Sequence, residues 1–224
     1  MRDPIERPAL RDEYFVRRLE AFGDVVIGFS LAFLGSSLIV PNHAAMLLSD
    51  PTWLAAYVWT FALVCSMWGG HYWTFRYVFV PTRLSLVLNY AKLGFVVLLI
   101  FTVQVLLRAF QSGSARDVVA ANELYWGCLC AYWVAAAAIL AIGMRVRGKQ
   151  LAPDVARRCL RRIWRVGTTA PAIVAGIAIA RANPSTMAST IALFMTAGVA
   201  AGTFAGRLAA RTQTVNDPSQ VSAR

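Results

Sequence analysis

The chain has 224 residues, of which 58% are hydrophobic and 15% are charged. With a mean hydropathy of +0.56, it is too apolar for a soluble domain of this length. The formal net charge of +11 does not indicate nucleic acid binding, because the basic residues lie between apolar segments and no recognition motif accompanies them. We therefore expect an integral membrane protein that contacts the lipid bilayer and not nucleic acid.

Apolar segments follow one another along the whole chain, and six of them are candidate membrane-spanning helices. Most are close to the roughly 20 residues that cross about 30 Å of hydrocarbon. None alternates as a membrane β-strand would, so the predicted fold is an all-α membrane protein with six transmembrane helices. The fifth segment is short and contains Pro171. The predicted spans are 19–40, 53–74, 84–107, 123–144, 166–182 and 187–206.

The connecting segments are too short for separate domains. We predict a cytoplasmic N-terminal segment at 1–18, a six-helix transmembrane domain at 19–206 and a polar cytoplasmic tail at 207–224. The longest connection, 145–165, is basic and apolar at helical spacing. It fits either a helix on the inner leaflet or a loop with a helical extension of the fifth span, and we favour the extension.

Lysine and arginine residues gather on one side of the predicted membrane. Most of the 22 basic residues lie in four segments: five in 1–18, two in 75–83, eight in 145–166 and three in the tail from 207. The opposite side has only three arginines. The positive-inside bias therefore predicts that both termini are cytoplasmic.

The first span carries an acid, Asp24, in the stretch RRLEAFGDVVIGFSLAFLG. An acid inside a membrane is costly, and it is usually paired or functional. At 3.6 residues per turn, the small residues Gly28, Ala32 and Gly35 share its face, which predicts that a neighbouring helix packs there. A second, bulkier stripe contains Phe22, Val26, Phe29, Phe33, Ser36 and Val40, and lipid contact or ordinary packing would explain it.

Polar residues of the second and third spans are predicted to lie at the depth of Asp24. His71 is near the cytoplasmic end of the second span, and Asn89 and Lys92 are near the same end of the third. We expect a hydrogen-bonded cluster, in which Lys92 could neutralise Asp24, because unsatisfied polar groups are costly there. A purely structural role is one interpretation of such a cluster. Arg18 could pair with Asp24, although an arginine at this boundary more often extends towards the interface.

The sequence shows no pattern typical of an enzyme or of a bound cofactor. There is no glycine-rich phosphate loop, no metal-ligand spacing and no nucleophile–base pair that could be named. The cysteines at 65, 128, 130 and 159 are best read as small apolar residues. We therefore expect no enzymatic activity, no metal and no cofactor.

The stretch RLEAFGD at 18–24 resembles the Arg-x-x-x-Phe-Ser-Asp signature that opens the first helix of the transmembrane protein 175 family. These proteins are endosomal and lysosomal potassium channels and their bacterial relatives. The resemblance continues in Trp68 and His71 of the second span and in Asn89 of the third, and it covers roughly residues 18–100. Spans four to six resemble the family in hydropathy only.

The resemblance implies a homotetramer in which four copies of the first helix line a central pore. It also implies an apolar constriction at the fifth, ninth and twelfth positions after the signature Asp, which are Phe29, Phe33 and Ser36 here. Family members usually have Ile or Leu at these positions. Two further departures are Gly23 in place of the signature Ser, and Lys92 where relatives tend to be apolar.

Three hypotheses follow from these residues. The leading one is a potassium-permeable, tetrameric cation channel of the bacterial inner membrane, in which Arg18, Phe22, Asp24, His71 and Asn89 hold the first helix in register. The second is a non-conducting scaffold or regulatory protein on the same fold, which Gly23 and the two phenylalanines favour. The third is a proton-coupled small-solute transporter that uses Asp24, His71 and Lys92 as a relay.

Overall fold

The computed structural model describes residues 8–36, 52–112, 114–181 and 187–215. Within these ranges the chain is all-helical and contains no strand, as the sequence predicts. The elements are α1 (Pro8–Ser36), α3 (Thr52–Tyr77), α4 (Arg83–Ser112), α5 (Ala115–Arg147), the short 3-10 helix η1 (Gly148–Gln150), α6 (Pro153–Ala180) and α7 (Met187–Val215). Val40 lies outside the described residues.

Three helices in the described part of the chain contain stretches long and apolar enough to cross a bilayer. These stretches are Glu13–Ser36, Arg83–Phe110 and Ala115–Arg147. Helix α7 contributes a shorter apolar stretch, Leu193–Ala209. The crossing of the membrane by all six predicted spans therefore stays a prediction, although a helix is present at each of them.

The helices are longer than the predicted spans, because polar residues at their ends continue the helical backbone. Helix α1 begins at Pro8, inside the segment predicted as an N-terminal extension. Helix α6 runs without interruption from Pro153 through Pro171 to Ala180. The second half of the basic segment at 145–165 is therefore a helical extension, which is the interpretation that we favoured.

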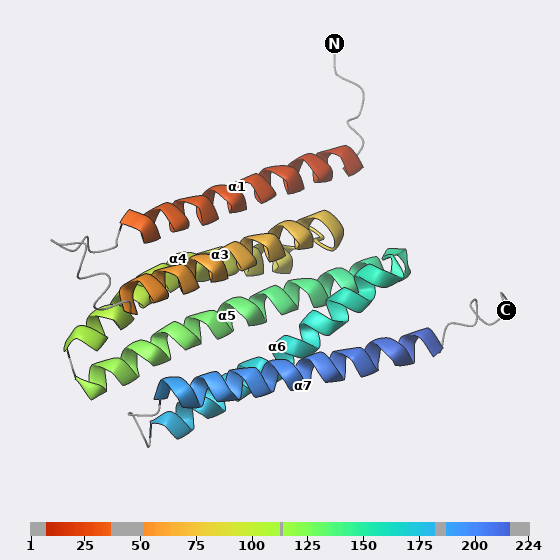
Figure 1. Ribbon diagram of the computed structural model, residues 1–224. Helices are drawn as coiled ribbons and strands as arrows, with labels where there is room; N and C mark the ends of the chain where they lie inside the picture. Colours follow the sequence, from red (N-terminus) through yellow and green to blue (C-terminus); the bar gives the residue numbers. More distant parts are fainter. Residues whose placement is uncertain (1–7, 37–51, 113, 182–186, 216–224) are drawn as a thin grey trace, which may run out of the picture.

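The connections that hold most of the basic residues lie at one end of the helical bundle. Figure 1 shows the start of α1, the α3–α4 connection, the start of α6 and the end of α7 at one end of the bundle. At this end, Arg147 donates hydrogen bonds to the carbonyl oxygens of Tyr77, at 3.1 Å, and of Phe79, at 3.0 Å. This contact holds the end of α5 against the α3–α4 connection. We refer to this end of the molecule as the basic end.

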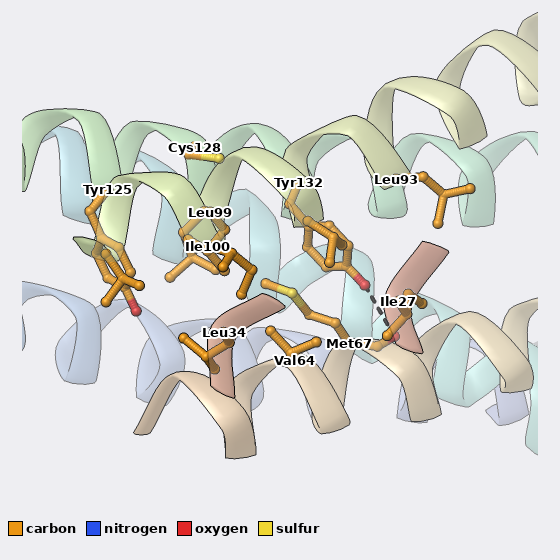
Figure 2. Close-up of a cluster of buried hydrophobic side chains, with 13 residues drawn as sticks. Ile27, Leu34, Val64, Met67, Leu93, Leu99, Ile100, Tyr125, Cys128 and Tyr132 are labelled. Carbon is orange, nitrogen blue, oxygen red and sulfur yellow. Dashed lines mark hydrogen bonds between the residues drawn. The ribbon is translucent and has the colours of Figure 1, made fainter. Parts of the chain in front are cut away.

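The main core lies between α1, α3, α4 and α5 (Figure 2). Ile27 and Leu34 of α1 meet Val64 and Met67 of α3, and the larger share of the cluster comes from α4 and α5. The Tyr132 hydroxyl donates a hydrogen bond to the carbonyl oxygen of Met67 at 3.2 Å, so its polar end is satisfied inside the core.

Helices α6 and α7 form a separate, tightly packed hairpin at the edge of the bundle (Figure 1). Their backbones approach because α7 presents glycines to α6. A Cβ added at Gly198 would lie 2.8 Å from the Cα of Thr169, and one at Gly206 would lie 2.9 Å from the Cα of Arg161. Close approach of helices at small residues is typical of packing within membranes.

Candidate functional site

Helix α1 has one face buried against the protein and one face that is open. The buried face contains Leu19, Gly23, Ile27, Ser30 and Leu34, at spacings of three and four residues. This spacing places all of them on one side of an α-helix. Through this face α1 packs against α3 and α4.

The open face of α1 carries the phenylalanines of the signature and of the predicted constriction. The exposed fraction is 50% for Phe22, 73% for Phe29 and 56% for Phe33. Ser36 is also exposed, and its hydroxyl donates a hydrogen bond to the carbonyl oxygen of Phe33 at 3.0 Å. We call Phe22, Phe29, Phe33 and Ser36 the phenylalanine face.

The prediction that Asp24 lies on a close-packed face is wrong for the single chain. Asp24, Gly28 and Ala32 are exposed, and a Cβ added at Gly28 would meet nothing within 4 Å. The larger side chains of Ile27 and Leu34 fill the groove between α3 and α4 instead. Gly28 and Ala32 therefore lie with Asp24 on an exposed side of α1 in the single chain.

Asp24 finds its partner on α3. The indole Nε1 of Trp68 donates a hydrogen bond to Asp24 Oδ1 at 2.8 Å. Both side chains are exposed, so this bond lies on the surface of the α1–α3 pair. A hydrogen bond to an ionised acceptor is short and strong, and here it connects the signature aspartate to the second span.

A second polar pair lies deeper, between α3 and α4. Lys92 Nζ and His71 Nδ1 are 3.0 Å apart, and the exposed fractions of the two residues are only 2% and 1%. The other ring nitrogen of His71, Nε2, has no hydrogen-bond partner among the described residues. The His71 ring also packs against Phe75, with 4.5 Å between ring centroids. Its position is therefore fixed from two sides.

Gly23 is explained by the position of His71. A Cβ added at Gly23 would overlap the His71 ring, with Cε1 only 2.6 Å away. Because Lys92 and Phe75 hold this ring, a serine at position 23 would require the ring or the helix to move. Gly23 and Lys92, which are two of the departures from the family signature, are thus parts of one packing arrangement.

The other predicted members of the polar cluster do not join these two pairs. Asn89 is fully buried, and neither its Oδ1 nor its Nδ2 atom has a hydrogen-bond partner among the described residues. Arg18 is exposed and lies over the ring of Tyr14, 5.6 Å from its centroid. Phe22 contacts Tyr90 edge-to-face, with 6.4 Å between ring centroids.

The structure thus brings Asp24 to Trp68, and His71 to Lys92 and Gly23. It shows no ion pair of Asp24 with Lys92 or Arg18 in the described ranges.

The sequence had not predicted the indole of Trp68 as the partner of Asp24. It had also not predicted that Arg162, Arg165 and Thr169 of α6 line one pocket together with Lys92. Their only sequence signal is the basic run RRCLRRIWR at 157–165.

The polar residues of this site serve as contacts between helices. No group of three His, Cys, Asp or Glu side chains in the described residues could hold a metal ion. The two polar pairs connect three consecutive helices. Trp68 of α3 bonds to Asp24 of α1, and His71 of α3 packs against Gly23 of α1. Lys92 of α4 contacts the same His71. Such contacts fix the rotation of α1 about its own axis.

Comparison with known proteins points to the same part of the chain. Residues 18–99 match the model of the family described as the endosomal/lysosomal potassium channel TMEM175. The match contains α3 and most of the described length of α1 and α4, and with them both polar pairs and the phenylalanine face. No curated protein and no solved structure gave a significant match.

Proposed function

The chain belongs, through residues 18–99, to the TMEM175 family of potassium channels, which are membrane proteins, and on this premise we propose that it is a potassium-permeable cation channel of the bacterial inner membrane. The observation that carries the proposal is the phenylalanine face of α1. It lies in the matched segment and carries Phe29, the most exposed large hydrophobic side chain described on α1. A helix that lines a pore must leave one face uncovered by its own chain.

We propose that four copies of the chain assemble around an axis lined by α1, as the family resemblance implies. Helix α1 lies at the edge of the bundle, so its open face is available to other copies (Figure 1). Rings of Phe29 and Phe33 would then form the narrowest part of the path, with Ser36 beyond them. Apolar constrictions of this kind gate channels by excluding water.

The two polar pairs would set which residues face this axis. Successive residues of an α-helix are about 100° apart, so a small rotation of α1 would replace one lining residue by another. The Trp68–Asp24 hydrogen bond and the contact of His71 with Gly23 both oppose such a rotation. The proposed role of Asp24 is therefore to position α1 and not to bind the ion.

The proposed orientation places the basic end of the bundle in the cytoplasm. It rests on the distribution of lysines and arginines in the sequence. The start of α1 and the end of α7 lie together at this end, which agrees with an even number of crossings (Figure 1).

A non-conducting scaffold on the same fold is the second candidate. The size of Phe29 and Phe33 favours it, because four aromatic rings at one level of a narrow axis would fill the axis. A proton-coupled transporter has less support, since a relay through Asp24, His71 and Lys92 needs Asp24 to connect with the His71–Lys92 pair, whereas Asp24 accepts its hydrogen bond from Trp68.

Potassium flux into liposomes tests the proposal. We expect measurable flux for the wild type. Flux should increase about tenfold or more for Phe29→Ala or Phe33→Ala, because a smaller side chain at the constriction admits water. Phe204→Ala, which truncates a similarly exposed phenylalanine on α7, is the matched control and should leave flux unchanged. Absence of flux in the wild type and in both α1 variants would reject the channel in favour of the scaffold.

A further inference from the structure

A pocket at the edge of the α6–α7 hairpin has a chemistry that conduction does not require. Its volume is about 360 Å³, and it lies between α3, α4, α5 and the hairpin. This is within the usual size range of small-molecule sites. Three cationic side chains line it, Lys92 from α4 and Arg162 and Arg165 from α6, and no acidic residue is among the lining residues.

The cations of this pocket lack negative partners. The ion pairs in the described part of the chain are Arg17–Glu13 and Arg181–Glu123, and neither involves a lining residue. His71 Nδ1 accepts one of the three hydrogen bonds that the Lys92 ammonium can donate. A buried charge without a counter-charge is costly, so an anion would be favoured beside it.

Arg162 is held in the pocket by an aromatic surface instead of a carboxylate. Its guanidinium lies 4.5 Å from the ring centroid of Trp73, on α3. Burial and the neighbouring charges of Arg158 and Arg165 lower the pKa of Arg162, which precedes the predicted fifth span. An arginine stays protonated in proteins even so. The site is thus crowded with positive charge that a ligand of opposite charge would relieve.

Thr169 gives an independent indication that a ligand is accommodated. It lines the same pocket and its exposed fraction is 2%, yet Oγ1 has no hydrogen-bond partner among the described residues. A helical threonine commonly donates to a carbonyl of the preceding turn, as Thr168 and Thr203 do here. The Thr169 hydroxyl, in contrast, has no acceptor among the described residues and lines the same pocket as the three cations.

We propose that this pocket binds a phosphate group that carries net negative charge, supplied either by the headgroup of an anionic lipid or by free inorganic phosphate. Arginine provides several fixed donors that match phosphate oxygens, and lysine adds a point charge. Basic pockets between membrane helices are suited to anionic headgroups. A phosphate there would connect α4 to α6, two helices that are separated by α5 (Figure 1).

Native mass spectrometry of the full chain in neutral detergent, with phosphatidylglycerol as the probe, tests the proposal. We expect the double variant Arg162→Gln/Arg165→Gln to bind about tenfold or more weakly than the wild type. The matched control is Arg157→Gln/Arg161→Gln, which removes the same charge from the same helix at residues that do not line the pocket, and which should bind like the wild type. Equal binding by the two double variants would overturn the proposal.

Added inorganic phosphate distinguishes the two sources. Displacement of phosphatidylglycerol from the wild type would show that phosphate alone is accepted, whereas retention would assign the site to the lipid headgroup. If Arg162→Gln/Arg165→Gln does not fold, Thr169→Val decides instead, because it keeps the volume and every charge. A loss of about threefold in affinity supports the site, and unchanged affinity overturns it.

Discussion

The two faces of α1 differ in how their chemistry is used. The buried face is made of aliphatic and small side chains, from Leu19 to Leu34, that fit between α3 and α4. The phenylalanine face carries bulky rings that touch little of their own chain. On a membrane helix both faces are apolar, so hydropathy does not separate them. The close packing of Gly23 against His71 and the hydrogen bond of Asp24 with Trp68 determine which face is which.

The rotation of α1 is thus specified by a few contacts near the basic end. In lipid, no hydrophobic driving force distinguishes an inward-facing from an outward-facing apolar side chain, and close packing and hydrogen bonds decide. Substitutions on the buried face should therefore change stability, and substitutions on the phenylalanine face should change conduction.

The largest expected effect comes from comparing Ile27→Ala with Phe29→Ala, which lie two residues apart on the two faces. Ile27 is buried, so its truncation leaves a cavity and should lower the free energy of unfolding by about 2 kcal/mol or more. Phe29→Ala should change it by less than about 0.5 kcal/mol, because the ring is exposed. Thermal or denaturant unfolding in detergent measures both values. A loss for Phe29→Ala as large as that for Ile27→Ala would remove the distinction between the faces.

Gly23→Ser, which restores the family signature, should destabilise this chain. The added Cβ overlaps the His71 ring, and overpacking of this kind costs about 1–3 kcal/mol. In a His71→Ala background the same substitution should cost much less, because the overlapping ring is gone. A double-mutant cycle on unfolding free energies provides the measurement. Additive effects of the two substitutions would show that His71 is not the reason for Gly23.

Smaller effects are expected at the Trp68–Asp24 hydrogen bond. Trp68→Phe removes the donor and should cost about 1 kcal/mol of stability. Asp24→Asn keeps a side-chain oxygen that can accept from Trp68, so stability and assembly should change by less than about 0.5 kcal/mol. Potassium flux should persist in Asp24→Asn, since the proposed role of Asp24 is to position the helix. Loss of all flux in a variant that assembles normally would favour a relay through Asp24.

A helix at each of the six predicted spans could be predicted from the sequence, because a long apolar run has few alternatives in a membrane. The ends of these helices could not be predicted as well. The residues of α1 before the first span and those at the start of α6 are polar or basic, yet they continue the helices. Hydropathy indicates where a helix meets lipid, and it does not show where the backbone stops being helical.

The candidate site was predicted in part, for a related reason. The polar residues of the first three spans were expected to meet, and the structure does bring His71 to Lys92. The choice of partners depends on rotations of α1 and α3 that periodicity leaves open. For this reason Asp24 was expected beside Gly28 and a neighbouring helix, whereas it bonds to Trp68 on an exposed surface. The packing of Gly23 against His71 depends on the same rotations and has no sequence signal of its own.

The central claim is that the phenylalanine face of α1 lines the ion path. Planar-bilayer recording of Phe29→Cys in a potassium gradient, before and after a cationic thiol reagent, tests it most directly. We predict that the reagent reduces the current of Phe29→Cys and leaves the wild type and Phe204→Cys unchanged. The wild-type cysteines, of which Cys128 and Cys159 are buried, set the baseline. A potassium current in Phe29→Cys that the reagent does not alter would contradict the account.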